Sequence, residues 1–208
     1  MTDLYTAVVA DVLDTLGYRN QCLGPEVRAL TDTGRVSGRV FTLRAEAVIE
    51  EADEPYKLEM AAVEAAQEGD VLLVDAGHDR TCGFWGELLT TACLAKGIRG
   101  IVMTACTRDL WALSEVSFSV FGIGSAPADS KGRLDVVEIG GVIEIDGVSA
   151  RTGDLILGDQ DGVVIIPQEI ADEAISLAHA KIAAENTVRD ELATGIPISE
   201  VFRKHGIL

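Results

Sequence analysis

The sequence predicts an α/β fold with central parallel strands, an added β layer and helices on the outside. Short apolar runs at 71–74, 100–104 and 116–121 alternate with two helical segments, and this strand–helix–strand order is typical of parallel crossovers. Residues 134–167 are rich in Val, Ile and Gly, which indicates a set of short strands. A long amphipathic segment then runs from Gln168 to Leu192. Ligand sites in such folds lie beyond the carboxyl ends of the parallel strands.

The first half of the chain has three further predicted elements. A helix is expected over 4–16, because apolar residues recur at helical spacing and Gly17 can cap its end. Residues 35–50 are rich in β-branched side chains that alternate with polar ones, so a strand is expected there. A second helix is expected over 55–67, with Leu58, Ala62 and Ala66 on one face.

The remaining segments follow the same reasoning. The residues after the first buried strand, 75–86, are expected to form a loop, and 87–96 a helix that Gly97 caps. A short helical piece should end at Ser114. The long C-terminal helix should end at Gly195 and Pro197, because neither residue favours a continued helix. We expect a single domain, 1–208, with 168–208 as a C-terminal helical extension.

Composition limits the class of protein. The chain has 208 residues and a formal net charge of −17. Such an acidic chain would repel phosphate, which argues against a nucleic-acid groove. The N-terminus carries acidic residues and no basic region, unlike a signal peptide, and no apolar run approaches the roughly 18 residues of a membrane span. The four cysteines are scattered without a metal-binding spacing. We therefore expect a cytoplasmic protein that binds neither nucleic acid nor membrane.

The residues from Gly86 to Asp109 are the strongest candidates for chemistry. The helix predicted to start at Glu87 would present free backbone N–H groups to a carboxylate. Arg108 follows the next buried strand, and its guanidinium could grip two oxygens at once. Asp109 and Glu87 are hard oxygen donors of the kind that hold Mg²⁺ together with water. Such a cleft suits a substrate that has a carboxylate beside a carbonyl.

A purely structural interpretation stays open for the same residues. Glu87 could be a favourable acid in the first turn of a helix, and Arg108 and Asp109 an ordinary surface ion pair. His78 lies in the loop predicted after 71–74, where a ligand would bind, and is a weaker candidate. Each of the five lysines lies on a predicted helix surface or in a polar turn, whereas imine chemistry needs a desolvated lysine.

Several of these motifs resemble the RraA-like family. The run from Trp85 to Leu89, then Arg108 and Asp109, matches the family in order and spacing. The segments 10–17, 153–154 and 158–164 with Pro167 are similar to its opening helix and its late β segment. The family includes metal-dependent 4-hydroxy-4-methyl-2-oxoglutarate/4-carboxy-4-hydroxy-2-oxoadipate aldolases and regulators of ribonuclease activity. The resemblance implies a swivelling β/β/α fold and a homotrimer or a dimer of trimers (a homohexamer), with sites at subunit interfaces.

The resemblance also implies roles for individual residues. Asp109 would ligate Mg²⁺ or Mn²⁺ directly, and Glu87 would hold metal-bound water. The backbone amides of Leu88 and Leu89, after Gly86, would bind the pyruvyl carboxylate, and Arg108 would contact the substrate oxygens. A glutamate from the last long helix of a neighbouring subunit completes the site in the aldolases. The position here that matches best is Glu185.

Four positions depart from the family pattern. Thr104 and Ala105 stand where Asp-Gly is common, Ala112 where an acid often follows, and Trp111 is unusually bulky. These departures affect the prediction of the substrate more than the prediction of the metal site.

Two functions follow from the resemblance. The first is a class II pyruvate aldolase, a carbon–carbon lyase that needs a divalent metal and cleaves a 4-hydroxy-2-oxo acid to pyruvate and a carbonyl product. Oxaloacetate decarboxylation passes through the same enolate and could share the site. The alternative is a non-catalytic regulator that binds ribonuclease E. The extension 168–208 favours the enzyme, because the regulators are shorter.

Overall fold

Side chains alternate along the central strands and so divide between the two faces of one sheet. In the computed structural model, which describes residues 3–207, β3 (Asp70–Trp85) sends Leu72 and Val74 into one buried cluster. Val71 and Leu73 of the same strand enter a second cluster on the opposite face. A strand that is buried on both faces needs a covering layer on each side.

The large sheet is mixed, with parallel strands at its centre. Its strands lie in the order β1 (Arg28–Ala29), β5 (Ser119–Gly122), β4 (Gly100–Thr107), β3, β2 (Val36–Ala47), β10 (Leu155–Gly158) and β11 (Val163–Ile166). The pairs from β5 to β2 are parallel, whereas β10 joins β2 antiparallel. Two further strands extend it, β6 (Gly124–Ser125) on β4 and β7 (Leu134–Ile139) on β2.

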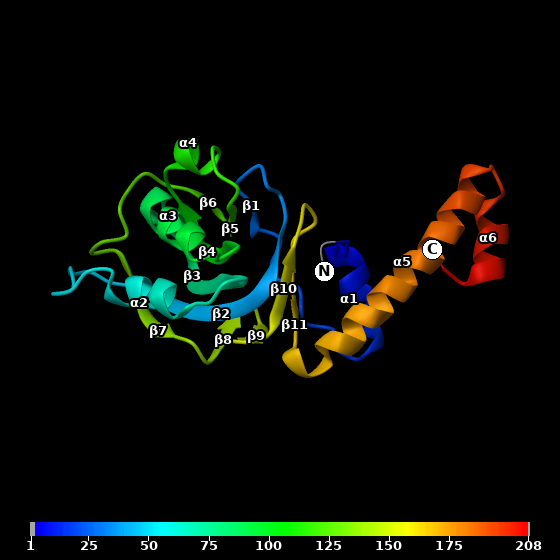
Figure 1. Ribbon diagram of the computed structural model, residues 1–208, viewed down its shortest axis with the longest axis horizontal. Coiled ribbons are helices and arrows are strands. Elements are labelled where there is room, and N and C mark those ends of the chain that lie inside the picture. The colour runs from blue at the N-terminus through cyan, green and yellow to red at the C-terminus, as the bar shows by residue number, and fades with distance from the viewer. Residues whose placement is uncertain (1–2, 208) are drawn as a thin grey trace.

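Helices cover one face of this sheet and a hairpin covers the other (Figure 1). The helices are α2 (Lys57–Ala65), α3 (Glu87–Ala95) and α4 (Leu110–Leu113), which contribute Ala62, Cys93 and Leu113 to the first cluster. The hairpin of β8 (Val142–Ile145) and β9 (Val148–Arg151) contributes Ile143, Ile145, Val148 and Ala150 to the second. The expected β/β/α layering, with its central parallel strands, is confirmed.

The N-terminal helix and the start of the long C-terminal helix pack together beside β10 and β11. The first helix, α1 (Thr6–Thr15), and the start of α5 (Ala171–Ala193) share a third apolar cluster with those strands. A single turn, η1 (Gln168–Ile170), leads into α5, and α6 (Ile198–His205) folds back on it. The distal part of α5 and α6 project from the body as an arm (Figure 1). No helix of residues 3–207 is long and apolar enough to span a bilayer.

The prediction of a loop over 75–86 is wrong. β3 continues to Trp85, because shifts of register after Val74, Asp79 and Gly83 let the strand bulge and rejoin β4. Bulged strands are common next to functional sites, where they redirect side chains. The short strands β1 and β6 were also not expected, and β5 begins at Ser119 instead of residue 116.

Candidate active site

The carboxyl ends of β3 and β4 bring the two predicted motifs together. Trp85 pairs with Thr107 in the last register of these strands, and the Arg108 N–H donates to the Trp85 carbonyl at 2.8 Å. Each strand then leads directly into a helix, α3 on one side and α4 on the other. Gly86 and Asp109 are the residues immediately before those helices, so they lie next to each other.

The backbone at position 86 lies so close to the Asp109 side chain that only glycine fits there. A Cβ at Gly86 would lie 2.6 Å from Asp109 Oδ2, which is closer than real contacts allow. Asp109 has a φ of 59°, a left-handed conformation that Asp tolerates better than most residues. Its Oδ2 accepts the N–H of Glu87 at 3.1 Å. One backbone donor of the helix start is therefore occupied by the protein itself, whereas Leu88 and Leu89 supply the next two.

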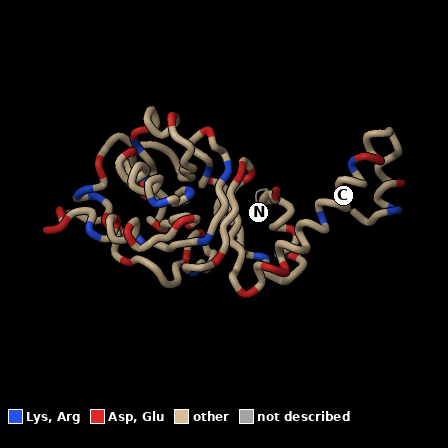
Figure 2. The backbone as a smooth tube through the Cα atoms, in the orientation of Figure 1, with Lys and Arg blue, Asp and Glu red and all other residues tan. Residues whose placement is uncertain are grey.

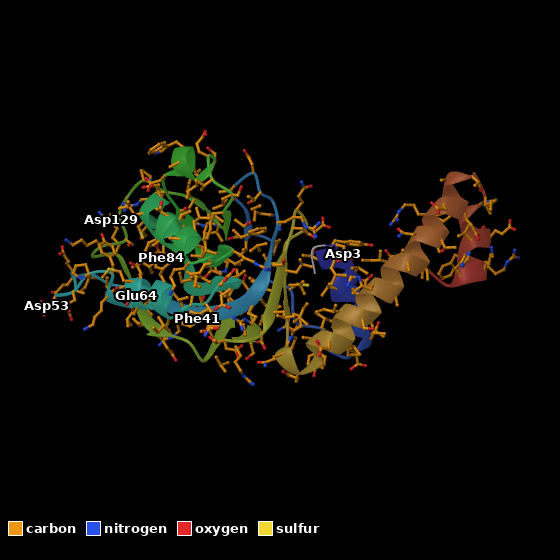
Figure 3. All side chains as sticks on the ribbon, viewed as in Figure 1. Asp3, Phe41, Asp53, Glu64, Phe84 and Asp129 are labelled. Atoms are coloured by element: carbon orange, nitrogen blue, oxygen red, sulfur yellow. The ribbon has the colours of Figure 1, made fainter. Side chains whose placement is uncertain are left out.

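A cavity of about 290 Å³ opens over this junction. It contains every residue that the family resemblance assigns to the site within one chain, and six further residues that were not predicted from the sequence. Its walls are formed by Tyr56, Glu59, Met60, Phe84, Gly86, Glu87, Leu88, Leu89, Arg108, Asp109, Asp129 and Ser130. Figure 3 shows Phe84 and Asp129 on the part of the body that α2 and α3 cover, away from the α5–α6 arm.

The charges in the cavity are unbalanced. Four of its lining residues are acids, and Arg108 is its one basic residue. Arg108 Nη1 lies 3.4 Å from Asp129 Oδ1, and Arg108 Nε lies 3.9 Å from Asp109 Oδ2. Neither contact is a bidentate pair, so the guanidinium keeps donors for a ligand.

Asp129 is held in its ionised form on the wall of the cavity. The Tyr56 hydroxyl donates to Asp129 Oδ2 at 2.7 Å. Burial raises the pKa of Asp129, but the hydrogen bond from Tyr56, the charge of Arg108 and the backbone N–H groups of Lys131 and Ser130 together outweigh it and hold the pKa below its ordinary value. Burial, together with the ionised Asp129, raises the pKa of Tyr56 to about 12. Tyr56 is therefore a neutral donor that positions Asp129.

Glu59 is the most unusual residue of the site. It lies on α2 and is 3% exposed, and neither of its carboxyl oxygens has a hydrogen-bond partner among the described residues. Burial, with the nearby charges of Asp135 and Asp129, raises the pKa of Glu59 to about 8 against the opposing effect of Arg108. A signal for it was present in the sequence, because Glu59 precedes Ala62, Val63 and Ala66 at the spacing of a buried helix face.

Glu185 and His78 lie away from this cavity. Glu185 is on α5, where its Oε2 accepts the Tyr5 hydroxyl at 2.6 Å and its Oε1 lies 3.5 Å from Lys181 Nζ. A role for Glu185 in the site of a neighbouring subunit stays a prediction. His78 faces Asp146, with 2.5 Å between His78 Nε2 and Asp146 Oδ1. No lysine is among the residues that line the cavity.

The donors suit a hard divalent cation that keeps several waters. Asp109 and Glu87 face the same cavity, and Mg²⁺ is usually held by one or two carboxylates with water and substrate. Within residues 3–207, no group of three or more His, Cys, Asp or Glu side chains is arranged to enclose a metal. Asp109 and Glu87 therefore fit a metal ion that keeps part of its water shell. They do not fit a structural metal whose ligands all come from the protein.

Comparison with known proteins agrees with this architecture. The family model described as RraA-like, Aldolase/RraA, matches residues 6–165. A protein of Halalkalibacterium halodurans, provisionally named a 4-hydroxy-4-methyl-2-oxoglutarate aldolase, is 30% identical over 86% of this chain and 80% of its own length. The crystal structure of Streptomyces coelicolor RraAS2, described as an unusual member of the RNase ES inhibitor RraA family, has a TM-score of 0.82 and 28% identity. The match covers 90% of this chain and 93% of that one.

A longer relative also matches. DlpA of Legionella pneumophila is 23% identical over 94% of this chain, which spans 31% of DlpA. The match to the family model extends over most of the chain and includes all of the residues that line the cavity. The protein belongs to the RraA-like family.

Proposed function

We propose that this protein is a divalent-metal-dependent aldolase, a carbon–carbon lyase that cleaves a 4-hydroxy-2-oxo acid to pyruvate and a carbonyl product. The observation that carries the proposal is the junction of Arg108 and Asp109 with the start of α3 in one acidic cavity. A relative provisionally named as an aldolase of this class supports it.

Each group has a task in this reaction. The amides of Leu88 and Leu89, at the positive end of α3, bind the substrate carboxylate. Arg108 donates to the 2-oxo oxygen, where negative charge develops as the C3–C4 bond breaks. A cation at Asp109, with its water at Glu87, would act as a Lewis acid on the same oxygen. Oxaloacetate would lose CO₂ through the same enolate.

The mouth of the cavity suggests how substrates are selected. Leu88 lines the cavity and is 78% exposed, and Trp111, which is 77% exposed, lines an adjoining hollow that shares Arg108 and Asp109 with the cavity. These apolar side chains would lie beside the part of the substrate beyond C4. We infer a preference for a carbonyl product with an apolar substituent.

We also propose that the active form is a homotrimer or a dimer of trimers. The arm of α5 and α6 carries exposed Ile198 and Phe202, and Figure 1 shows this arm projecting from the body. Exposed apolar side chains on a projecting helix are typical of a subunit contact. Such a contact would bring Glu185 of one subunit toward the cavity of another.

The second candidate is a regulator that binds ribonuclease E without catalysis. The likeness to RraAS2 favours it, and Figure 2 shows acidic residues at positions along the whole chain. An acidic surface can bind a basic protein segment.

A coupled assay of pyruvate release separates the two candidates. The substrates are a panel of 4-hydroxy-2-oxo acids and oxaloacetate with Mg²⁺, and the variant is Asp109→Ala. The matched control is Glu115→Ala, which removes an exposed acid that does not line the cavity. The aldolase predicts turnover by the wild type and by Glu115→Ala alone. No turnover, together with inhibition of ribonuclease E by all three proteins, would establish the regulator instead.

A further inference from the structure

Glu59 is a buried acid that lines a ligand cavity and has no hydrogen-bond partner among the described residues. Both of its oxygens are unpaired among the described residues, although Arg108 and Asp129 line the same cavity. A buried polar group without a hydrogen-bond partner destabilises the folded state. The neighbours of Glu59 on α2, Ala62 and Val63, are apolar, so a methionine or leucine would avoid that cost. An acid at this position therefore needs a reason beyond packing.

The surroundings of Glu59 keep it uncharged but able to ionise. Burial raises its pKa to about 8, and the negative charges of Asp135 and Asp129 act in the same direction. Arg108 opposes them. A general acid or base works best when its pKa is close to the working pH.

The neighbouring groups of the cavity are engaged in other ways. Tyr56 donates to Asp129, and the pKa of Asp129 is held low. Asp109 accepts the N–H of Glu87. No histidine, lysine or cysteine is among the lining residues. Glu87 Oε1 accepts the Thr91 hydroxyl at 3.2 Å. Glu59 is thus the lining acid whose two oxygens both lack a hydrogen-bond partner among the described residues, and it is best placed to take up and release a proton.

We propose that Glu59 is the proton-transfer residue of this cavity, which carries the substrate's hydroxyl proton to C3 of the pyruvate enolate. The inference rests on the proposed aldolase function. Ionised Glu59 accepts the proton of the C4 hydroxyl while the C3–C4 bond breaks and its electron pair enters the enolate. The O–H bond of Glu59 then breaks and a C3–H bond forms, which yields pyruvate and regenerates the carboxylate. One proton moves, and none is gained or lost.

The structure of the substrate allows one residue to carry out both proton transfers. C3 and the C4 oxygen are separated by only two bonds, so one carboxyl group can reach both. The burial of Glu59 favours its protonated form, which assists the first transfer. The second transfer is then driven by the basicity of the enolate carbon.

The test uses the reverse of the second transfer, in which the methyl protons of pyruvate exchange with solvent deuterium. Wild-type protein, Glu59→Gln and Glu64→Gln are incubated with pyruvate and Mg²⁺ in D₂O, and the methyl signal is followed by NMR. Glu64 is the matched control, because it lies on the same helix but is exposed and does not line the cavity (Figure 3). Glu59→Met suits the apolar wall and serves if the Gln variant does not fold.

We expect exchange by the wild type and by Glu64→Gln, and a loss of at least about 100-fold in Glu59→Gln at saturating pyruvate. The wild-type rate should rise with pH and level off above about pH 8, and the residual rate of Glu59→Gln should lack that rise. Pyruvate affinity, measured by titration calorimetry, should change little.

Other results would overturn the proposal in distinguishable ways. If Glu59→Gln exchanges at the wild-type rate while substrate is cleaved, Glu59 is not the proton carrier and the aldolase function stands. If only pyruvate affinity falls, Glu59 is a binding residue. If the wild type neither cleaves any substrate nor exchanges pyruvate, both proposals fail.

Discussion

The ionisation of Glu59 should make the stability of the folded protein depend on pH. The perturbation is Glu59→Gln, which keeps the shape of the side chain and removes its titration. In the unfolded chain the carboxyl has its ordinary pKa of 4.5, and in the fold burial raises the pKa to about 8. Each unit of difference is about 1.4 kcal/mol, so the full effect is on the order of 5 kcal/mol.

The direction follows from which state holds the proton. Below pH 4.5 Glu59 is protonated in both states, and its contribution is constant. Between pH 4.5 and about 8 the unfolded chain releases the proton and the folded protein keeps it. The free energy of unfolding therefore falls as pH rises through this window. Above about pH 8 both states are ionised and the effect is complete.

Urea unfolding at fixed protein concentration and in the presence of chelator measures this contribution. The quantity of interest is the unfolding free energy of the wild type minus that of Glu59→Gln, at intervals from pH 5 to 9. We expect this difference to decrease by several kcal/mol over the range, and Glu64→Gln to track the wild type. A difference that stays constant within about 1 kcal/mol would show that Glu59 ionises normally, and would refute the reasoning from its burial.

Three further results are expected. Asp109→Ala should lose nearly all activity, because we propose that Asp109 ligates the metal directly. Glu87→Gln should lose less, because we propose that Glu87 acts through metal-bound water. Wild-type turnover of Asp109→Ala at limiting Mg²⁺ would exclude that assignment. Arg108→Lys should lower kcat by about 10²–10³, since in the proposed reaction the planar guanidinium stabilises charge that develops in the transition state. A change in KM alone would mean that Arg108 binds the ground state of the substrate instead. Light scattering should give a trimer or hexamer, whereas a 22.1 kDa monomer would remove the role of a second subunit.

The layered core could be predicted because its signals are local. The apolar runs at 71–74 and 100–104 are short and continuous, and each is followed by a helix with a recognisable end. Such strands are buried on both faces, which requires crossovers and two covering layers. The position of Arg108 and Asp109 at the end of a parallel strand followed from the same reasoning.

The missed parts depend on contacts between distant segments. The stretch of β3 from residue 75 to residue 83 is mostly polar and contains two glycines, Gly77 and Gly83, so its sequence is typical of a loop. It is a strand because β4 and the chain near Asp129 pair with it in shifted registers. Sequence patterns do not contain that pairing, since it depends on where the bulges form.

The walls of the cavity were only half predicted for a related reason. Gly86 to Leu89 and Arg108–Asp109 lie at strand ends, where ligand sites gather. Glu59 is on α2, Tyr56 immediately precedes that helix, and Asp129 is in the segment between β6 and β7. Their place in the site depends on how α2 packs over the sheet. Of these three residues, only Glu59 could have been recognised from the sequence, because it is an acid on an otherwise apolar helix face.

The most direct test of the account is the metal dependence and stoichiometry of the cleavage. Purified protein is stripped with chelator, and Mg²⁺ or Mn²⁺ is added back with a 4-hydroxy-2-oxo acid while both products are followed by NMR. The account predicts no cleavage after stripping and, once the metal is restored, pyruvate and the carbonyl product in equal amounts. Cleavage that persists in chelator, or a lysine adduct trapped by borohydride, would contradict the proposed chemistry of Asp109 and Arg108.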